Sequence, residues 1–209
     1  MITTYVFDLD DTLIPYDVRE EKAYALLAAA GADTERMRAL NLSLWPEVAI
    51  GRLPIEEKWR REALAGGVAP EMADRFVAAL VDFDPAFEDA LPVLERLAAA
   101  GARLAIITNG PPGDHQRAKL RKTGLDRFFG DFVFISSEVG AAKPDARIFR
   151  HALEVLGVTP AESLYVGDKA EHDAAAAAAV GMQGVWLDRR GSSSPAPTGV
   201  RRITTLAQL

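Results

Sequence analysis

The sequence predicts an α/β protein with one parallel β-sheet, helices packed on its faces, and a helical segment inserted after the first strand. Short runs of β-branched and aromatic residues alternate with helical patterns along most of the chain. This alternation is typical of βαβ units, because neighbouring parallel strands need a long crossover connection. Residues 14–86 lack a strand pattern and instead show apolar residues at helical spacing.

The strands are expected where β-branched and aromatic residues cluster between turn residues. The expected strands are 2–9, 103–108, 131–136, 163–167, 184–187 and a short last one near 200–203. The crossover helices are expected at 92–100, 113–123 and 144–156, because a glycine follows each of them. We expect a catalytic core formed by residues 1–15 and 84–209 and a helical cap domain formed by residues 16–83.

Composition limits the kinds of partner and site. The 209 residues include 24 Lys and Arg, 30 Asp and Glu, 3 His and no Cys, and the net charge is −6. An acidic chain of this kind is not expected to bind a nucleic acid polymer or an anionic membrane. Without cysteine, any metal must be held by oxygen or histidine ligands. The sequence has no leader pattern and no apolar run of ~18 residues, so we expect a soluble, cytoplasmic protein.

Polar residues follow the strands at the points where the strands end. Ligands of open α/β sheets bind beyond the carboxyl ends of the strands, so these residues are expected to meet at one edge. They are Asp8, Asp10, Asp11, Thr12, Thr108, Asn109, Lys143, Asp168 and Asp173. Each has a simpler explanation when taken alone, since Asp, Asn and Thr favour turns and helix N-caps and lysines are often solvated.

Together these residues indicate a cation site beside an anion site. Carboxylates about 4 Å apart repel by ~4 kcal/mol at an effective dielectric constant of 20, so gathering Asp8, Asp10 and Asp168 requires a cation. Oxygen ligands of this kind suit Mg²⁺, which usually keeps several waters and binds a substrate phosphate. Lys143 and Thr108 would then face that phosphate.

The motifs that carry these residues resemble those of the haloacid dehalogenase (HAD) superfamily of phosphatases. The matching segments are Phe7-Asp8-Leu9-Asp10-Asp11-Thr12-Leu13, Ile107-Thr108-Asn109-Gly110, Lys143-Pro144-Asp145, and Gly167-Asp168 with Asp173. The resemblance implies a Rossmann-like core with a helical C1 cap, of the subgroup that contains nucleotidases and phosphoglycolate phosphatases. Between Thr108 and Lys143 there is room only for one helix and one strand, so the second cap position is empty. His172 stands where many members have Asn.

The resemblance also implies a role for each matching residue. Asp8 would be the nucleophile that forms an aspartyl-phosphate, and Asp10 would be the general acid and base. Mg²⁺ would be bound by Asp8, by the carbonyl of Asp10 and by Asp168. Asp173 would contact the residues around the metal rather than the metal itself. Thr108, Asn109 and Lys143 would hold the phosphoryl oxygens. With a phosphate bound beside Asp8, we expect the negative charges to raise the pKa of the Asp10 carboxyl, to an extent that Mg²⁺ and Lys143 limit.

The expected function is therefore Mg²⁺-dependent hydrolysis of small phosphate monoesters, such as a nucleotide, a sugar phosphate or phosphoglycolate. Its partner would be a small phosphorylated metabolite. A phosphomutase or other phosphotransferase shares every motif and stays open. A 2-haloacid dehalogenase uses a nucleophilic Asp without metal, but that branch lacks an acid at the position of Asp10. A receiver-like module also gathers Asp, Thr and Lys around Mg²⁺, but it has no cap.

Substrate selectivity is expected to depend on cap residues able to stack on a ring or to pair with a second anion. The candidates are Tyr16, Trp45, Arg52, Trp59, Arg60 and Arg61. The alternative is structural, since tryptophans often form the core of a small domain and arginines often cover its surface.

Overall fold

The computed structural model describes residues 1–82 and 85–209, and within them six strands form one parallel sheet. The strand order is β3-β2-β1-β4-β5-β6. The strands are β1 (Thr4–Phe7), β2 (Arg103–Thr108), β3 (Val133–Ile135), β4 (Ser163–Gly167), β5 (Gln183–Leu187) and β6 (Arg201–Ile203). The predicted α/β class is confirmed, and β1 lies in the interior of the sheet between β2 and β4.

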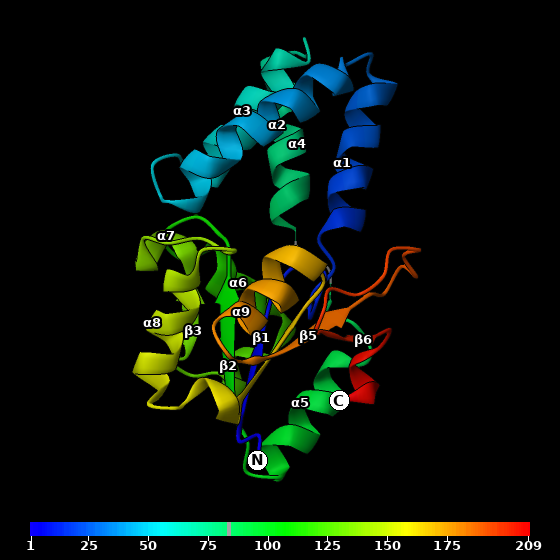
Figure 1. Cartoon of the computed structure of the whole chain (residues 1–209). Helices are drawn as coiled ribbons and strands as arrows, with labels where there is room; N and C mark the ends of the chain where they lie inside the picture. The colour runs from blue at the N-terminus through cyan, green and yellow to red at the C-terminus, as the bar shows by residue number, and fades with distance from the viewer. Residues whose placement is uncertain (83–84) are drawn as a thin grey trace.

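Helices cover both faces of the sheet because its buried strands carry apolar side chains on both sides. Phe7 and Ile106 pack on the face covered by α5 (Ala90–Ala99) and α6 (His115–Thr123). Val6 and Ile107 pack on the opposite face. The helices on that second face are α7 (Ser136–Val139), α8 (Ala146–Leu156) and α9 (Ala176–Ala179). The result is a three-layer core, with both termini at the end away from the inserted helices (Figure 1).

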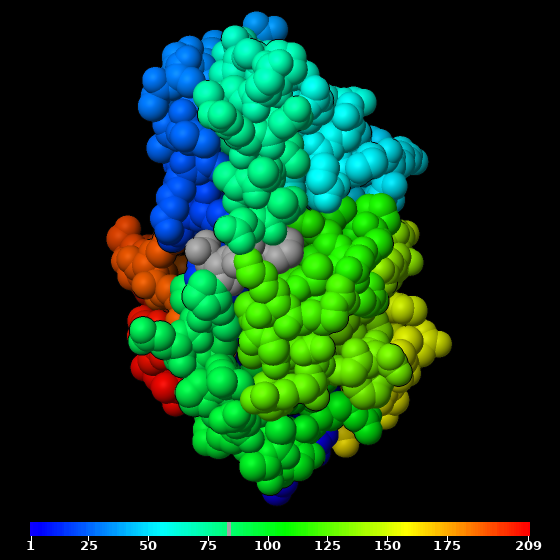
Figure 2. Space-filling view, turned by 180° about the vertical axis from the view of Figure 1, so that it is seen from behind, coloured from blue at the N-terminus to red at the C-terminus, as the bar shows by residue number. Residues whose placement is uncertain are grey.

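The insertion after β1 forms a cap with an apolar core of its own. Its helices are α1 (Asp17–Ala29), α2 (Thr34–Ala49), α3 (Ile55–Ala65) and α4 (Pro70–Val81). Trp59 is fully buried in this core, and the rings of Tyr24 and Phe76 meet edge to face at 5.5 Å. Figure 1 shows the cap above the sheet, and Figure 2 shows from behind that it reaches down onto the core. The expected domain boundary at 83 and 84 lies outside the described residues.

All three predicted crossover helices begin two residues away from their expected starts, at Ala90, His115 and Ala146. The helix expected from Pro144 begins at Ala146, because the Asp145 carboxylate accepts a hydrogen bond from the Arg147 N–H and caps it there. The alanine-rich segment near 174–179 begins as a π-helical turn, Ala170–Ala175, and continues as α9. No helix in the described part of the chain is long and apolar enough to cross a membrane.

Candidate active site

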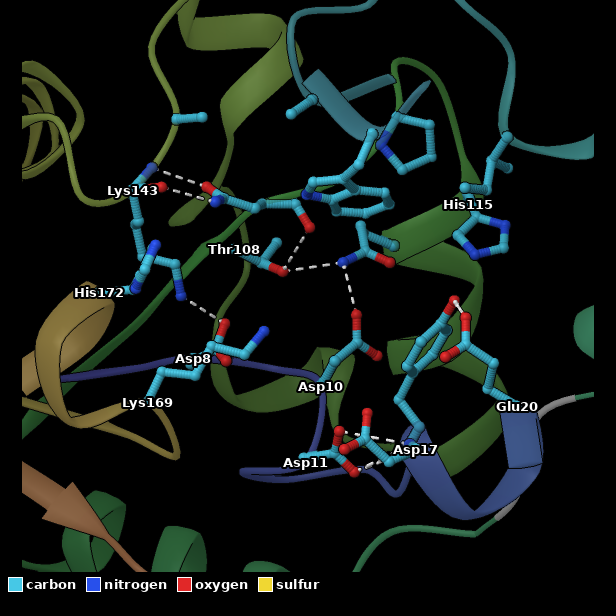
Figure 3. A pocket seen from close by; sticks show the side chains of 18 of the residues that line it. Asp8, Asp10, Asp11, Asp17, Glu20, Thr108, His115, Lys143, Lys169 and His172 are labelled. Carbon is cyan, nitrogen blue, oxygen red and sulfur yellow. Dashed lines mark hydrogen bonds and ion pairs between the residues drawn. The ribbon is translucent and has the colours of Figure 1, made fainter. Parts of the chain in front are cut away.

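A cavity of about 580 Å³ lies between the cap and the carboxyl ends of the strands. Its floor includes Asp8 and Asp10 from the loop after β1, Thr108 from the end of β2, and Lys143 from the loop between α7 and α8. Figure 3 shows these four side chains around one space, although the residues are far apart in the sequence. The strand ends therefore place the predicted residues together, as the parallel topology requires.

An acidic cluster occupies one side of this floor. Asp8, Asp168 and Asp173 each offer one carboxylate oxygen, and these oxygens lie within 4.8 Å of one another. Burial, together with the charges of Asp8 and Asp173, raises the pKa of Asp168 to about 8. Asp168 Oδ1 is buried and accepts no hydrogen bond from the described residues. A buried acceptor without a donor, beside two other carboxylates, fits a divalent cation such as Mg²⁺.

Lys143 lies at the centre of the floor and joins the acidic residues. Its Nζ is 2.6 Å from Asp8 Oδ1, 2.6 Å from Asp173 Oδ1 and 2.9 Å from the Tyr165 hydroxyl. Burial lowers the pKa of Lys143, but Asp173 and Asp8 outweigh this effect, so its pKa is raised and the amine is charged. Burial raises the pKa of Asp8 to about 6 although Lys143 opposes the shift. The lysine therefore orients the carboxylate of Asp8.

Asn109 positions Lys143 in this structure. Its amide Nδ2 donates to the Lys143 carbonyl at 2.9 Å, and its Oδ1 accepts from the Lys143 N–H at 2.8 Å. Asn109 also lines the cavity. The side chain of Asn109 thus joins its motif to the backbone of Lys143, a contact that the sequence does not reveal.

Asp10 is held by two residues of α6 that the sequence analysis missed. Lys119 Nζ lies 2.7 and 2.8 Å from the two carboxylate oxygens of Asp10, and Gln116 Nε2 donates to Oδ2 at 3.1 Å. The same Gln116 nitrogen is 2.8 Å from Thr108 Oγ1. Burial raises the pKa of Asp10, but the Lys119 charge and these hydrogen bonds lower it below its ordinary value. The raised pKa expected beside a bound phosphate stays a prediction, and the phosphate charge must outweigh these contacts with α6.

The roof of the cavity contains three of the six selectivity candidates. Tyr16, Trp45 and Trp59 line the cavity, whereas the three arginines are not among its described lining residues. Each arginine is paired on the cap surface instead, and the pairs are Arg52 with Glu47, Arg60 with Asp74 and Arg61 with Glu57. Trp59 is therefore both part of the cap core and a wall of the cavity, and its part in selectivity stays a prediction.

Three polar cap residues that the sequence analysis missed also line the roof, namely Glu20, Asn41 and Lys58. Glu20 Oε1 accepts hydrogen bonds from the Tyr16 hydroxyl and from Asn41 Nδ2, both at 3.2 Å. Lys58 is fully buried, and its Nζ lies 2.6 Å from Glu62 Oε1. The roof thus presents a carboxylate and an amide toward the floor, which no spacing in the sequence indicates.

The repulsion within the acidic cluster predicts an unusual stabilising substitution. In metal-free protein, Asp168→Asn should raise the melting temperature, and more so at pH 8 than at pH 5. The folded state holds the Asp168 pKa near 8, above its ordinary value of 3.8, so stability is lost as pH rises through this range. We expect a gain of ~1–2 kcal/mol at pH 8, or about 2–6 °C.

Thermal melts at both pH values, with and without Mg²⁺, measure this effect. Mg²⁺ should stabilise the wild type and stabilise Asp168→Asn much less, because the substitution removes a proposed ligand. A lower melting temperature for metal-free Asp168→Asn at pH 8 would show that the cluster is not under electrostatic strain.

Comparison with known proteins agrees with this geometry. Residues 2–181 match the family model of haloacid dehalogenase-like hydrolases. The chain is 32% identical to the pyrimidine 5′-nucleotidase YjjG of Escherichia coli, over 92% of this chain and 90% of that protein. It is 30% identical to the glyceraldehyde 3-phosphate phosphatase of Methanopyrus kandleri, over 91% of this chain and 85% of that protein.

A phosphoserine phosphatase of Thermus thermophilus is 42% identical over 65% of this chain, but the match spans only 55% of that protein. Among solved structures, the magnesium-bound HAD-hydrolase YfnB of Bacillus subtilis matches with a TM-score of 0.73 and 23% identity, over 99% of this chain and 96% of that one. This structural likeness supports the fold, and the curated relatives are phosphatases. The chain therefore belongs to the haloacid dehalogenase-like hydrolases and is a phosphatase of that family with a helical cap inserted after β1.

Proposed function

We propose that this phosphatase hydrolyses small phosphate monoesters in a Mg²⁺-dependent reaction that passes through an aspartyl-phosphate on Asp8. The observation that carries the proposal is the environment of Asp8. Its buried carboxylate contacts the charged Lys143 amine, shares a cluster with Asp168, and faces a cavity that also contains Asp10. A carboxylate oriented in this way is placed to attack phosphorus.

The first step transfers the phosphoryl group to the protein. An oxygen of Asp8 forms a bond to phosphorus, the ester P–O bond breaks, and Asp10 supplies the proton that the leaving oxygen needs. In the second step, Asp10 removes a proton from a water that attacks phosphorus, and the carboxylate of Asp8 is released with inorganic phosphate. The low pKa of Asp10 in the free protein suits this second role, because a base must be ionised. The first role needs a protonated carboxyl, which the negative charge of a bound phosphate would favour.

The residues around Asp8 assist both steps. Thr108, Asn109 and Lys143 would bind the phosphoryl oxygens, and the Lys143 charge would balance the negative charge that the substrate brings. Mg²⁺ would be held by Asp8, Asp168 and the backbone carbonyl of Asp10, where it would supply Lewis-acid neutralisation of the phosphoryl group. Asp173 would position Lys143, which it contacts at 2.6 Å.

The leaving group would extend from this floor toward the cap. Tyr16, Trp45 and Trp59 would form its apolar contacts, and selectivity among esters would depend on them. The names of the relatives include a nucleotidase and a sugar-phosphate phosphatase, which supports a small phosphorylated metabolite as substrate. The presence of Asp10 favours phosphoryl transfer over dehalogenation.

A screen of phosphate monoesters with and without metal tests this proposal. We expect hydrolysis in Mg²⁺ to fall by at least ~10²-fold in EDTA and to return when Mg²⁺ is added in excess. The panel should include nucleotides, sugar phosphates, phosphoglycolate and phosphoserine. Undiminished turnover in EDTA would contradict the metal dependence, and release of halide from a 2-haloacid would support the dehalogenase alternative.

A further inference from the structure

The side chain of Ser136 joins the cap to the phosphate-binding loop through a single oxygen atom. Ser136 is fully buried at the start of α7, directly after β3. Its Oγ lies 2.8 Å from the carbonyl oxygen of Ala49 and accepts a hydrogen bond from the Gly110 N–H at 3.0 Å. A hydroxyl has one proton, and the short distance assigns that proton to Ala49.

The two partners belong to different parts of the site. Ala49 is the last residue of α2 in the cap, and it lines the cavity. Gly110 follows Thr108 and Asn109, which line the floor. Ser136 therefore contacts both the roof and the floor at once.

The surrounding surfaces fit closely at this contact. Gly51, in the turn after α2, adopts a φ of +79°, and a Cβ placed there would lie 3.3 Å from Ser137 Cβ and 3.6 Å from Pro112 Cγ. Gly110 is equally constrained, since a Cβ there would lie 2.7 Å from Gln116 Cγ. Figure 1 shows the α2–α3 end of the cap above α7, on the side of the molecule away from the base of α1.

We infer that Ser136 is a positioning residue that holds the cap closed over the floor and keeps the Asn109–Gly110 loop in place when the cap is closed. Opening the cap breaks the bond to Ala49, whose carbonyl can then bind water. Removing the hydroxyl therefore favours the open state, because the closed state would leave the Ala49 carbonyl and the Gly110 N–H buried without this partner. Only the kinetic part of this inference rests on the proposed phosphatase activity.

Spin labels can measure closure without any substrate. The chain has no cysteine, so Leu64→Cys on α3 and Val155→Cys on α8 give one label on the cap and one on the core. Both side chains are exposed, by 40% and 52%, and neither is among the described lining residues of the cavity. Pulsed electron–electron double resonance then gives the distribution of cap-to-core distances.

Ser136→Ala should broaden this distribution toward longer distances, whereas Ser137→Ala should leave it unchanged. Ser137 is a matched control, because its buried Oγ has no hydrogen-bond partner in the described part of the chain. An unchanged distribution in folded Ser136→Ala would overturn the inference, and so would an equal change in both variants. Thermal melts establish that each variant is folded.

A second variant reaches the same contact from the cap. Gly51→Ala would place a Cβ against Ser137 and Pro112, and its φ of +79° strains any side chain there, so the variant should push the turn after α2 away while keeping the Ser136 side chain. It should broaden the distribution in the same direction. If Ser136→Ala fails to fold, this variant decides the question, and an unchanged distribution would overturn the inference.

Kinetics give an independent readout. If only a fraction of the protein is closed, the apparent KM rises by the inverse of that fraction, while saturating substrate restores closure and keeps kcat. We expect Ser136→Ala to raise KM about fivefold to tenfold with kcat within about twofold of the wild type. A loss of kcat with unchanged KM would contradict the closure role. Should no ester be hydrolysed by the wild type, the proposed function fails, and the label distances still decide this inference.

Discussion

Asp8→Asn should abolish phosphate ester hydrolysis, with kcat reduced by at least ~10⁴-fold. The amide cannot attack phosphorus, and it also removes one negative ligand from the acidic cluster. The variant should stay folded, because it relieves repulsion with Asp168 and Asp173. Steady-state rates with p-nitrophenyl phosphate and an alkyl phosphate, in excess Mg²⁺, measure the loss.

Asp114→Asn is the matched control for this change. Asp114 is an exposed carboxylate of the core that pairs with Arg121, and it is not among the described lining residues of the cavity. Its rates should equal those of the wild type. Full activity of Asp8→Asn would refute the assignment of the nucleophile.

Asp10→Ala should damage alkyl phosphates far more than p-nitrophenyl phosphate. A positioned acid contributes ~10²–10⁴-fold, but only where the leaving oxygen needs a proton, and nitrophenolate leaves without one. The correct observable is kcat/KM, which reports the steps up to departure of the alcohol or phenol. The later hydrolysis of the aspartyl-phosphate, in which Asp10 acts on every substrate, does not enter this ratio.

Asp10→Asn separates proton transfer from geometry. The amide oxygen can still accept a hydrogen bond from Lys119, so the contact with α6 is kept. The same difference between the two esters is expected for this variant. Equal losses of kcat/KM for both esters would show that Asp10 acts through geometry or metal binding.

The sequence predicted the fold and the floor of the site well because both depend on local patterns. Asp8, Thr108 and Asp168 each stand at or just beyond the end of a strand, and a parallel sheet brings such ends to one edge. Strand type follows from β-branched runs, and the strands at 103–108 and 163–167 have the predicted bounds. The parallel topology of the sheet then brings residues that are distant in the sequence close together in space.

The contacts that adjust the chemistry were not predictable in this way. Lys119 and Gln116 lie on a polar helix, where a lysine or glutamine normally points to solvent, and only the packing of α6 near the loop after β1 brings them to Asp10. The lowered pKa of Asp10 in the free protein was therefore not predicted. A carboxylate near other carboxylates is expected to gain a proton, unless a buried cation lies closer.

The cap residues that reach the site were harder still to predict, because helical spacing does not show which face of a helix meets the core. Arg60 and Arg61 stand next to Trp59 in the sequence, but α3 turns them to the surface, where they pair with Asp74 and Glu57. Lys58, on the other side of Trp59, is buried and lines the cavity instead. One step along a helix rotates a side chain by about 100°, and this decides which residue reaches the site.

Direct detection of the phosphorylated protein tests the central claim, that Asp8 carries the phosphoryl group. The protein is mixed with excess acetyl phosphate and Mg²⁺, quenched in acid within the first turnovers, and examined by intact mass spectrometry and peptide mapping. We expect a fraction of the chain to be heavier by one phosphoryl group, located on Asp8 and absent from Asp8→Asn. A phosphoryl group on another residue, or an equal mass increase in Asp8→Asn, would contradict it.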